Sequence, residues 1–218
     1  MAVSLLGLAN KYGGEPIWVF GSGATLNFLD PAFFDDKVCV STNFVGGKFG
    51  LNSYTTFTHY HADAELVAAE RPDLLVVTVR RNFLTGHAWI DAPANVVLYD
   101  GLFEPTGPLF DVDGKHWPDD PDSLVFGSSS LHGSMHLAAY MGASHIVLVG
   151  ADCGQLDGEH RFAEYEQCGD QPWAIYERDL RAMKAKLFAE YGCPVYSLNP
   201  FVNPSLEGHT YTGAVNIN

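Results

Sequence analysis

The sequence has 218 residues, enough for one domain with a sizeable hydrophobic core and elaborated loops. It carries 12 basic and 26 acidic residues, a net charge of −14, with 47% hydrophobic and 17% charged residues. The hydrophobic content excludes intrinsic disorder. The acidic balance argues against binding nucleic acid or an anionic membrane surface, because both are held through clustered Lys and Arg. A single small phosphate stays compatible, since backbone amides can hold it without a positive side chain.

Cysteine spacing and the N-terminus indicate the compartment. The four cysteines, Cys39, Cys153, Cys168 and Cys193, form no C-x-x-C pair, which predicts free, mostly buried thiols in a reducing compartment. Residues 1–14 include an apolar stretch without a basic start or an A-x-A-like cleavage site, and the stretch is too short to span a bilayer. We therefore expect a short N-terminal helix and a cytoplasmic protein with no membrane span.

Short apolar, β-branched runs recur along the chain and predict strands. They lie at residues 16–20, 37–41, 54–58, 74–79, 95–99, 145–150 and 194–198. Continuous apolar runs bounded by Gly, Asp and Asn are typical of strands that are covered on both faces, which indicates a mostly parallel sheet.

Helical patterns alternate with these strands, near residues 61–70, 129–141 and 173–190. The last has apolar residues at roughly helical spacing: Ile175, Leu180, Met183, Leu187 and Phe188. We therefore expect a single α/β domain over residues 1–218, with a Rossmann-like, mostly parallel sheet and helices on both faces. Two aperiodic stretches, 101–123 and 153–172, are expected to be loop insertions of the kind that form lids or binding loops.

Ligands of open α/β sheets bind outside the carboxyl ends of the strands, so the residues that follow each apolar run are the candidate site. They mix amide, hydroxyl, imidazole and carboxylate groups, which suits a polar, phosphate-bearing ligand: Gly21, Ser22, Gly23, Asn43, His59, Ser129, Ser130 and Asp152. For the glycines the alternative is an ordinary tight turn, and for the two serines it is plain capping of a helix. Asp152 could accept from a ligand, bind a divalent ion or cap a turn.

A resemblance rests on motifs in consistent order over about two-thirds of the chain. They are Gly21-Ser-Gly-Ala-Thr-Leu, then Ser-Thr-Asn43-Phe, then Ser129-Ser130-x-x-x-Ser-Met135, Gly142 and Ile146-Val-Leu-Val-Gly150-x-Asp152, and finally Glu190-Tyr191-Gly-Cys-Pro-Val-Tyr196-Ser-Leu-Asn199-Pro200. The sequence thereby resembles the small bacterial sialyltransferases, the related glycosyltransferase-like proteins of flagellin modification, and the 6-hydroxymethylpterin diphosphokinase-like family.

The resemblance implies a glycosyltransferase-like fold and a CMP-type sugar nucleotide as donor substrate. Gly21, Ser22, Gly23, Ser129 and Ser130 would then approach the phosphate or ribose. Asn43, Asp152 and His59 would contact the nucleotide, with His59 where the family has a donor-contacting Asn. The family's general-base His precedes the last helix, where this chain has Gln171-Pro172-Trp173. The imidazole in the preceding insertion is His160, which becomes the candidate base; the alternatives are a solvated loop histidine, different acceptor chemistry or lost activity.

Other functions remain open at the level of sequence. One is a non-catalytic module that binds a nucleotide or sugar phosphate, and another is a pterin diphosphokinase-like enzyme with Mg²⁺ near Asp152. A metal-dependent hydrolase would use His59, His61 and Asp63, which read H-x-H-x-D.

Two further groups predict structure rather than metal binding. His132 and His136 have helical metal-ligand spacing, but Gly133 replaces the glutamate of a metalloprotease, so capping or core packing is expected. The acidic residues Asp111, Asp113, Asp119, Asp120 and Asp122 match no EF-hand spacing and are expected to be solvated. The expected partners are a nucleotide sugar and an acceptor glycan or small molecule; formation of a homo-oligomer is left open.

Overall fold

A computed structural model describes residues 4–81, 88–89, 91–102, 123–125, 129–152, 161–163 and 173–198. Its centre is an eight-stranded sheet in the order β6-β5-β4-β3-β2-β1-β7-β8. The strands are β1 (Pro16–Phe20), β2 (Val38–Thr42), β3 (Thr55–Thr58), β4 (Leu75–Val79), β5 (Val96–Leu102), β6 (Ser123–Val125), β7 (His145–Val149) and β8 (Val195–Ser197). All seven neighbouring pairs are parallel, which confirms the predicted sheet.

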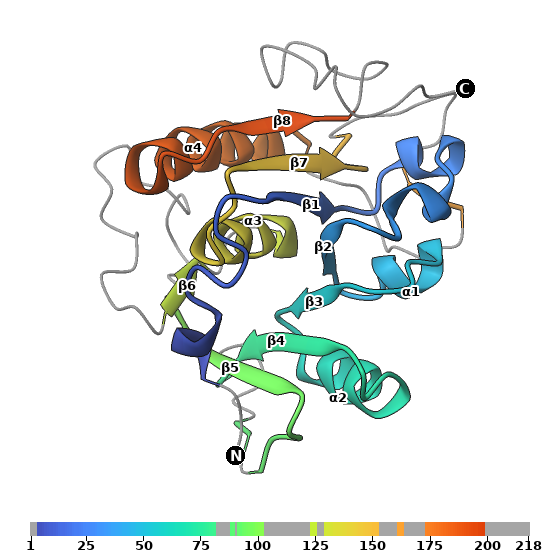
Figure 1. The fold of residues 1–218 in the computed structure, drawn as a ribbon, viewed down its shortest axis with the longest axis vertical. Coiled ribbons are helices and arrows are strands. Elements are labelled where there is room, and N and C mark those ends of the chain that lie inside the picture. The colour runs from blue at the N-terminus through green and yellow to red at the C-terminus, as the bar shows by residue number, and fades with distance from the viewer. Residues whose placement is uncertain are drawn as a thin grey trace.

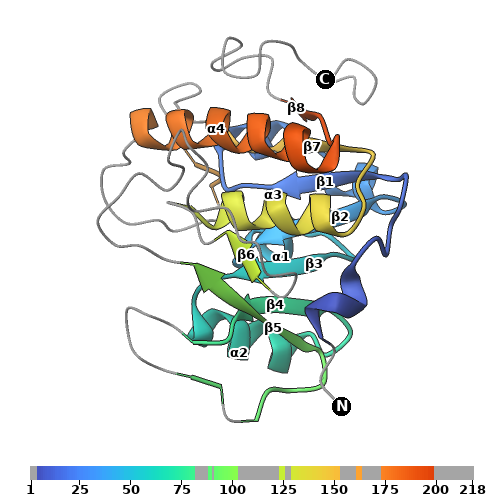
Figure 2. The same cartoon turned by 90° about the vertical axis from the view of Figure 1, so that its left-hand side faces the viewer.

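Helices cover both faces of the sheet, as expected (Figure 1). One face carries α3 (Ser130–Tyr140) and α4 (Trp173–Tyr191), which lie in front of the sheet in Figure 2. The other carries α1 (Val45–Phe49) and α2 (His61–Glu70), together with the 3-10 helices η2 (Ala24–Phe28) and η3 (Pro31–Phe34). The predicted N-terminal helix is the 3-10 helix η1, Leu5–Leu8.

The core follows from the alternation of side chains along the buried strands. Val19, Val40 and Phe57 face α3, whereas Phe20 and Cys39 face the η2–η3 side. Gly133 lets α3 lie directly on β3, because a Cβ there would stand 2.2 Å from Cζ of Phe57. On α4, Leu180, Met183 and Leu187 are buried as their spacing predicts, but Phe188 is 63% exposed.

The strand order reverses beside β1. From β1 the chain builds outward through β2 to β6 on one side, then returns to place β7 against the other side of β1. In open α/β sheets the crevice at the carboxyl ends of the strands beside such a reversal is where ligands bind. The topology therefore puts the candidate site after β1 and β7.

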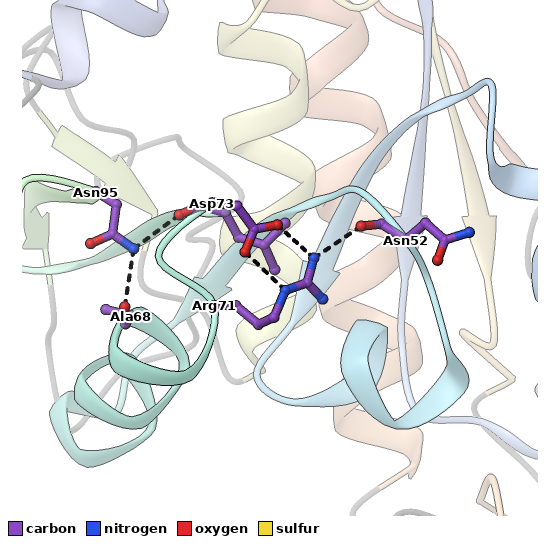
Figure 3. Close-up of polar contacts among 6 residues, drawn as sticks. Asn52, Ala68, Arg71, Asp73 and Asn95 are labelled. Carbon is purple, nitrogen blue, oxygen red and sulfur yellow. Dashed lines mark hydrogen bonds and ion pairs between the residues drawn. The ribbon is translucent and has the colours of Figure 1, made fainter.

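Loops at the amino-terminal edge of the sheet are tied together by polar contacts (Figure 3). The Arg71 guanidinium pairs with the Asp73 carboxylate at 2.7 Å and donates to the carbonyl of Asn52 at 3.0 Å. The side-chain Nδ2 of Asn95 donates to the carbonyls of Ala68 and Leu74. These contacts join the segments before β3, β4 and β5, at the edge opposite the carboxyl ends of the strands.

Three further findings bear on the sequence predictions. Cys39 and Cys193 are buried free thiols, and burial raises their pKa values to about 12 and about 11. Cys153 and Cys168 lie outside the described residues, as do most of the predicted insertions at 101–123 and 153–172. Within the described ranges, no helix combines the length and the apolar character that crossing a bilayer requires.

Candidate functional site

Two glycine turns interlock at the reversal of strand order. The Gly21 amide donates to the Val149 carbonyl at 2.8 Å, and the Gly23 amide donates to the Gly150 carbonyl at 2.7 Å. A Cβ on Gly21 would stand 2.7 Å from the Gly150 oxygen, and one on Gly23 would stand 2.6 Å from it. The glycines are therefore needed for close approach of two backbones. Because both amides already bond to β7 and its turn, they are not directed at a ligand.

Asp152, the candidate that follows β7, links this turn to the one after β1. Its Oδ2 accepts from the Thr25 amide and its Oδ1 from the Thr25 hydroxyl, each at 2.7 Å. Asp152 is 3% exposed and Thr25 is fully buried. Burial raises the pKa of the Asp152 carboxyl, and the two bonds from Thr25 partly oppose that rise. The carboxylate holds the start of η2 against β7.

Ser22 is the half-buried residue between the two glycines. Its carbonyl accepts from the Phe162 amide at 2.8 Å, so residues 161–163 of the second insertion lie against this turn. Its N–H makes no hydrogen bond to any other described residue. Within the described part of the chain, the N–H and the hydroxyl of Ser22 are therefore the donors of this turn that can face an anion.

The helix α3 connects β6 to the parallel strand β7, so it runs antiparallel to both strands (Figure 2). It therefore begins at the same edge of the sheet, where β6 ends. Ser129 is its N-cap, and the Ser129 hydroxyl accepts from the Leu131 amide at 3.2 Å. Ser130 is buried, and its carbonyl accepts from the Ser134 hydroxyl at 2.9 Å. Ser129 thus caps α3, which is the alternative that the sequence leaves open for the two serines.

Asn43 and His59 follow β2 and β3 at this edge. The backbone of Asn43 is left-handed, with φ of +47°, and its amide donates to the Phe57 carbonyl at 2.9 Å. Non-glycine residues in this region are uncommon and gather at functional sites. His59 Nδ1 lies 2.8 Å from the Tyr99 hydroxyl, and both side chains are buried. Ser22, Asn43 and His59 therefore come from three neighbouring strand ends in order.

The metal-site hypothesis finds no support in the geometry. His61 Nε2 hydrogen-bonds to the Val79 carbonyl at 2.7 Å, whereas His59 Nδ1 bonds to Tyr99. Asp63 lies in the first turn of α2, and burial raises the pKa of its carboxyl. Among the described residues, no group of three or more His, Cys, Asp or Glu side chains could hold a metal ion.

The paired histidines of α3 belong to the core, as their sequence context predicts. His136 Nδ1 accepts from the Val125 amide at 3.0 Å, and its Nε2 lies 2.9 Å from the Tyr191 hydroxyl. Burial lowers the pKa of His132 to about 4 and that of His136 to about 3, so both imidazoles are neutral near pH 7. His160 and the five aspartates between 111 and 122 lie outside the described residues.

Two residues near the site, Asn27 and Phe162, were not singled out from the sequence. Thr25 was among the candidates, because it stands within the Gly-Ser-Gly-Ala-Thr motif that follows β1. Asn27 bonds to Arg161 and Ala163, 134 and 136 positions away. Phe162 bonds to Ser22. No local pattern marks Asn27 or Phe162.

Comparison with known proteins adds one structural likeness. The sequence matches no known family model and no curated protein. The structure resembles that of the sialyltransferase CST-II, solved in complex with a trisaccharide acceptor and CMP, with a TM-score of 0.55. The likeness covers 93% of this chain and 88% of that one. The fold is glycosyltransferase-like. At 13% sequence identity the likeness concerns the fold, and it does not extend to the pterin diphosphokinase part of the resemblance noted in the sequence.

Proposed function

We propose that the protein is a glycosyltransferase that binds a CMP-sugar at the carboxyl edge of β1, β2 and β3. The observation that carries this proposal is the order of Ser22, Asn43 and His59 on successive strand ends beside the reversal of strand order. Parallel strands are about 4.8 Å apart, so these ends span about 10 Å, which suits a nucleoside monophosphate. The CMP bound in the structurally similar sialyltransferase supports the same choice of ligand.

In this proposal the donor phosphate lies against Ser22 and the start of α3. The Ser22 N–H and hydroxyl donate to it, and the amino end of α3 favours the negative charge there. Asn43 and His59 contact the nucleoside, while Gly21, Gly23 and Asp152 hold the turn in shape. A pocket of this kind needs no clustered Lys and Arg, which agrees with the net charge of −14.

The reaction we propose is displacement at the anomeric carbon. The oxygen of an acceptor hydroxyl attacks that carbon, the bond from the carbon to the phosphate oxygen breaks, and the bonding electrons leave with the phosphate of CMP. The donors at Ser22 stabilise that departing charge. The hydroxyl proton passes to a base within hydrogen-bond reach. We propose His160, which lies two positions before Phe162, the residue whose amide bonds to Ser22.

A non-catalytic CMP-binding module is the second candidate function. It is favoured by the segment before α4, where the sequence reads Gln171-Pro172 and supplies no imidazole. Both functions require the same pocket, so only turnover separates them.

The test is CMP release from a panel of CMP-sugars, followed by chromatography, with CMP affinity measured in parallel. We expect release by the wild-type protein, a rate about 10²–10⁴-fold lower for His160→Ala, and little change in the affinity of that variant for CMP. The control is His145→Ala, because His145 begins β7 at the opposite edge of the sheet. Thermal stabilisation by CMP without release would establish the binding module, and no response to CMP would refute both functions.

A further inference from the structure

Asn27 joins η2 to residues 161–163, which lie within the second insertion. Its Oδ1 accepts from the Ala163 amide at 3.0 Å, and its Nδ2 reaches the Arg161 carbonyl at 3.4 Å. Between these two contacts, the Phe162 amide donates to the Ser22 carbonyl at 2.8 Å. Three consecutive residues of the insertion are thereby fastened to the turn after β1 and to the helix that follows it.

The Phe162 ring strengthens this attachment. Phe162 is 8% exposed, and its ring meets the Phe49 ring edge-on, with centroids 5.8 Å apart. Both rings belong to the core cluster on the η2–η3 side of the sheet. The segment is therefore attached by a buried aromatic side chain as well as by hydrogen bonds.

These contacts fix one peptide group at both of its ends. In the peptide that joins Ser22 to Gly23, the N–H donates to the Gly150 carbonyl and the C=O accepts from the Phe162 amide. The first contact belongs to the sheet, and the second depends on residues 161–163 staying in place. The orientation of this peptide sets the direction of the Ser22 side chain.

We propose that Asn27 is a positioning residue for the transfer reaction. It holds Arg161–Ala163 against Ser22 and so keeps the Ser22 hydroxyl aimed at the charge that develops on the departing phosphate. This inference rests on the proposed function. Preorganised donors act on the transition state more than on the bound ground state, so Asn27 affects kcat more than it affects the affinity for CMP.

The attachment can be tested without any turnover, because Arg161 precedes a peptide bond that trypsin can cleave. In the folded protein the Arg161 carbonyl and the Phe162 amide are both bonded, so cleavage there requires local opening. We expect Asn27→Ala to be cleaved between Arg161 and Phe162 about tenfold faster than wild type, as loss of a hydrogen bond of ordinary strength implies. Mass spectrometry identifies the fragment.

Turnover tests the positioning role. For Asn27→Ala we expect kcat for CMP release to fall about tenfold while the Kd for CMP stays within about threefold of wild type. Asn27→Asp keeps the acceptor for the Ala163 amide but loses the donor to the Arg161 carbonyl, so it should fall between wild type and Asn27→Ala in both assays. Asn52→Ala is the matched control. Asn52 is an exposed asparagine whose side-chain Nδ2 donates to the Asp35 carboxylate at the amino-terminal edge of the sheet.

Each result decides part of the proposal. Unchanged cleavage of Asn27→Ala overturns the attachment, and faster cleavage with unchanged kcat overturns the positioning role. If the wild-type protein releases no CMP from any donor, the proposed function fails and the positioning role falls with it. The cleavage result still stands by itself as a test of the attachment.

Discussion

Asp152 offers a direct test of how the site is built. Asp152→Ala removes both acceptors of Thr25, which is fully buried. A buried donor left without a partner costs about 1–3 kcal/mol. Two such donors, offset by the burial of one fewer charge, give an expected loss of about 2–4 kcal/mol in the free energy of unfolding. Urea unfolding at pH 7 measures this loss.

Asp152→Asn separates support of the turn from chemistry. Its carbonyl oxygen still accepts from the Thr25 amide, and its NH₂ group can donate to the Thr25 hydroxyl, so we expect a loss of about 1 kcal/mol. CMP release should stay within about tenfold of wild type, because the turn keeps its shape. A catalytic carboxylate or nucleotide ligand at this position would lose about 10²–10⁴ in rate on the same change.

The pH dependence of stability gives an independent check on Asp152. Because burial raises the pKa of its carboxyl above the ordinary value of 3.8, the folded protein holds this proton more tightly than the unfolded chain. The stability of wild type relative to Asp152→Asn should therefore fall as the pH rises from about 3.8 through the raised pKa, and stay constant above it. The control is Asp73→Asn, at the exposed ion pair on the opposite edge.

The rate of CMP release decides whether Asp152 only supports the turn. A loss of that rate above a hundredfold in a stable Asp152→Asn protein would refute this role.

Further substitutions test the rest of the structure. Gly23→Ala places a Cβ 2.6 Å from the Gly150 oxygen; it should lower the free energy of unfolding by about 1–3 kcal/mol and weaken CMP binding, measured by calorimetry. Burial lowers the pKa of His136 to about 3 in the folded protein. The free energy of unfolding should therefore fall as the pH drops below 6.5, by up to about 1.4 kcal/mol per pH unit. In His136→Gln the urea midpoint should depend less on pH across this range. Arg71→Ala removes an exposed ion pair with Asp73 and should leave the urea midpoint nearly unchanged, because water and salt screen such pairs.

Each of these expectations has a contradicting result. Normal CMP affinity in Gly23→Ala would mean that the interlocked turns do not shape the pocket. A wild-type pH dependence in His136→Gln would mean that this imidazole is not held neutral by burial. A large, salt-insensitive loss in Arg71→Ala would mean that the amino-terminal edge contributes more to stability than its exposure suggests.

Most of the fold could be predicted because strands buried on both faces consist of continuous apolar runs. Seven strands and the three longer helices were found within a few residues of their observed ends. The strand β6 was missed because it has only three residues and begins at the end of an aperiodic stretch. The helix α1 was missed because its sequence, VGGKF, contains two glycines, which disfavour helix.

The sequence indicates at which edge of the sheet the candidate site lies, but not how the groups of that edge are hydrogen-bonded. Strand ends mark the ligand-binding edge of any parallel sheet, so Ser22, Asn43 and His59 were identifiable. Hydrogen-bond directions were not, since they depend on which strand pairs with β1. That pairing turns the Gly23 amide toward β7 and brings Asp152 to Thr25, 127 positions away. The role of Asn27 depends on a contact across a similar separation.

The proposed pocket places CMP at the carboxyl edge of the sheet, beside the reversal of strand order. Hydrogen exchange followed by mass spectrometry, with and without saturating CMP, tests it most directly. We expect slower exchange in peptides that contain Ser22, Asn43 and Ser129–Ser130. Unchanged exchange in those peptides, or protection confined to the opposite edge around Arg71 and Asn95, would contradict it.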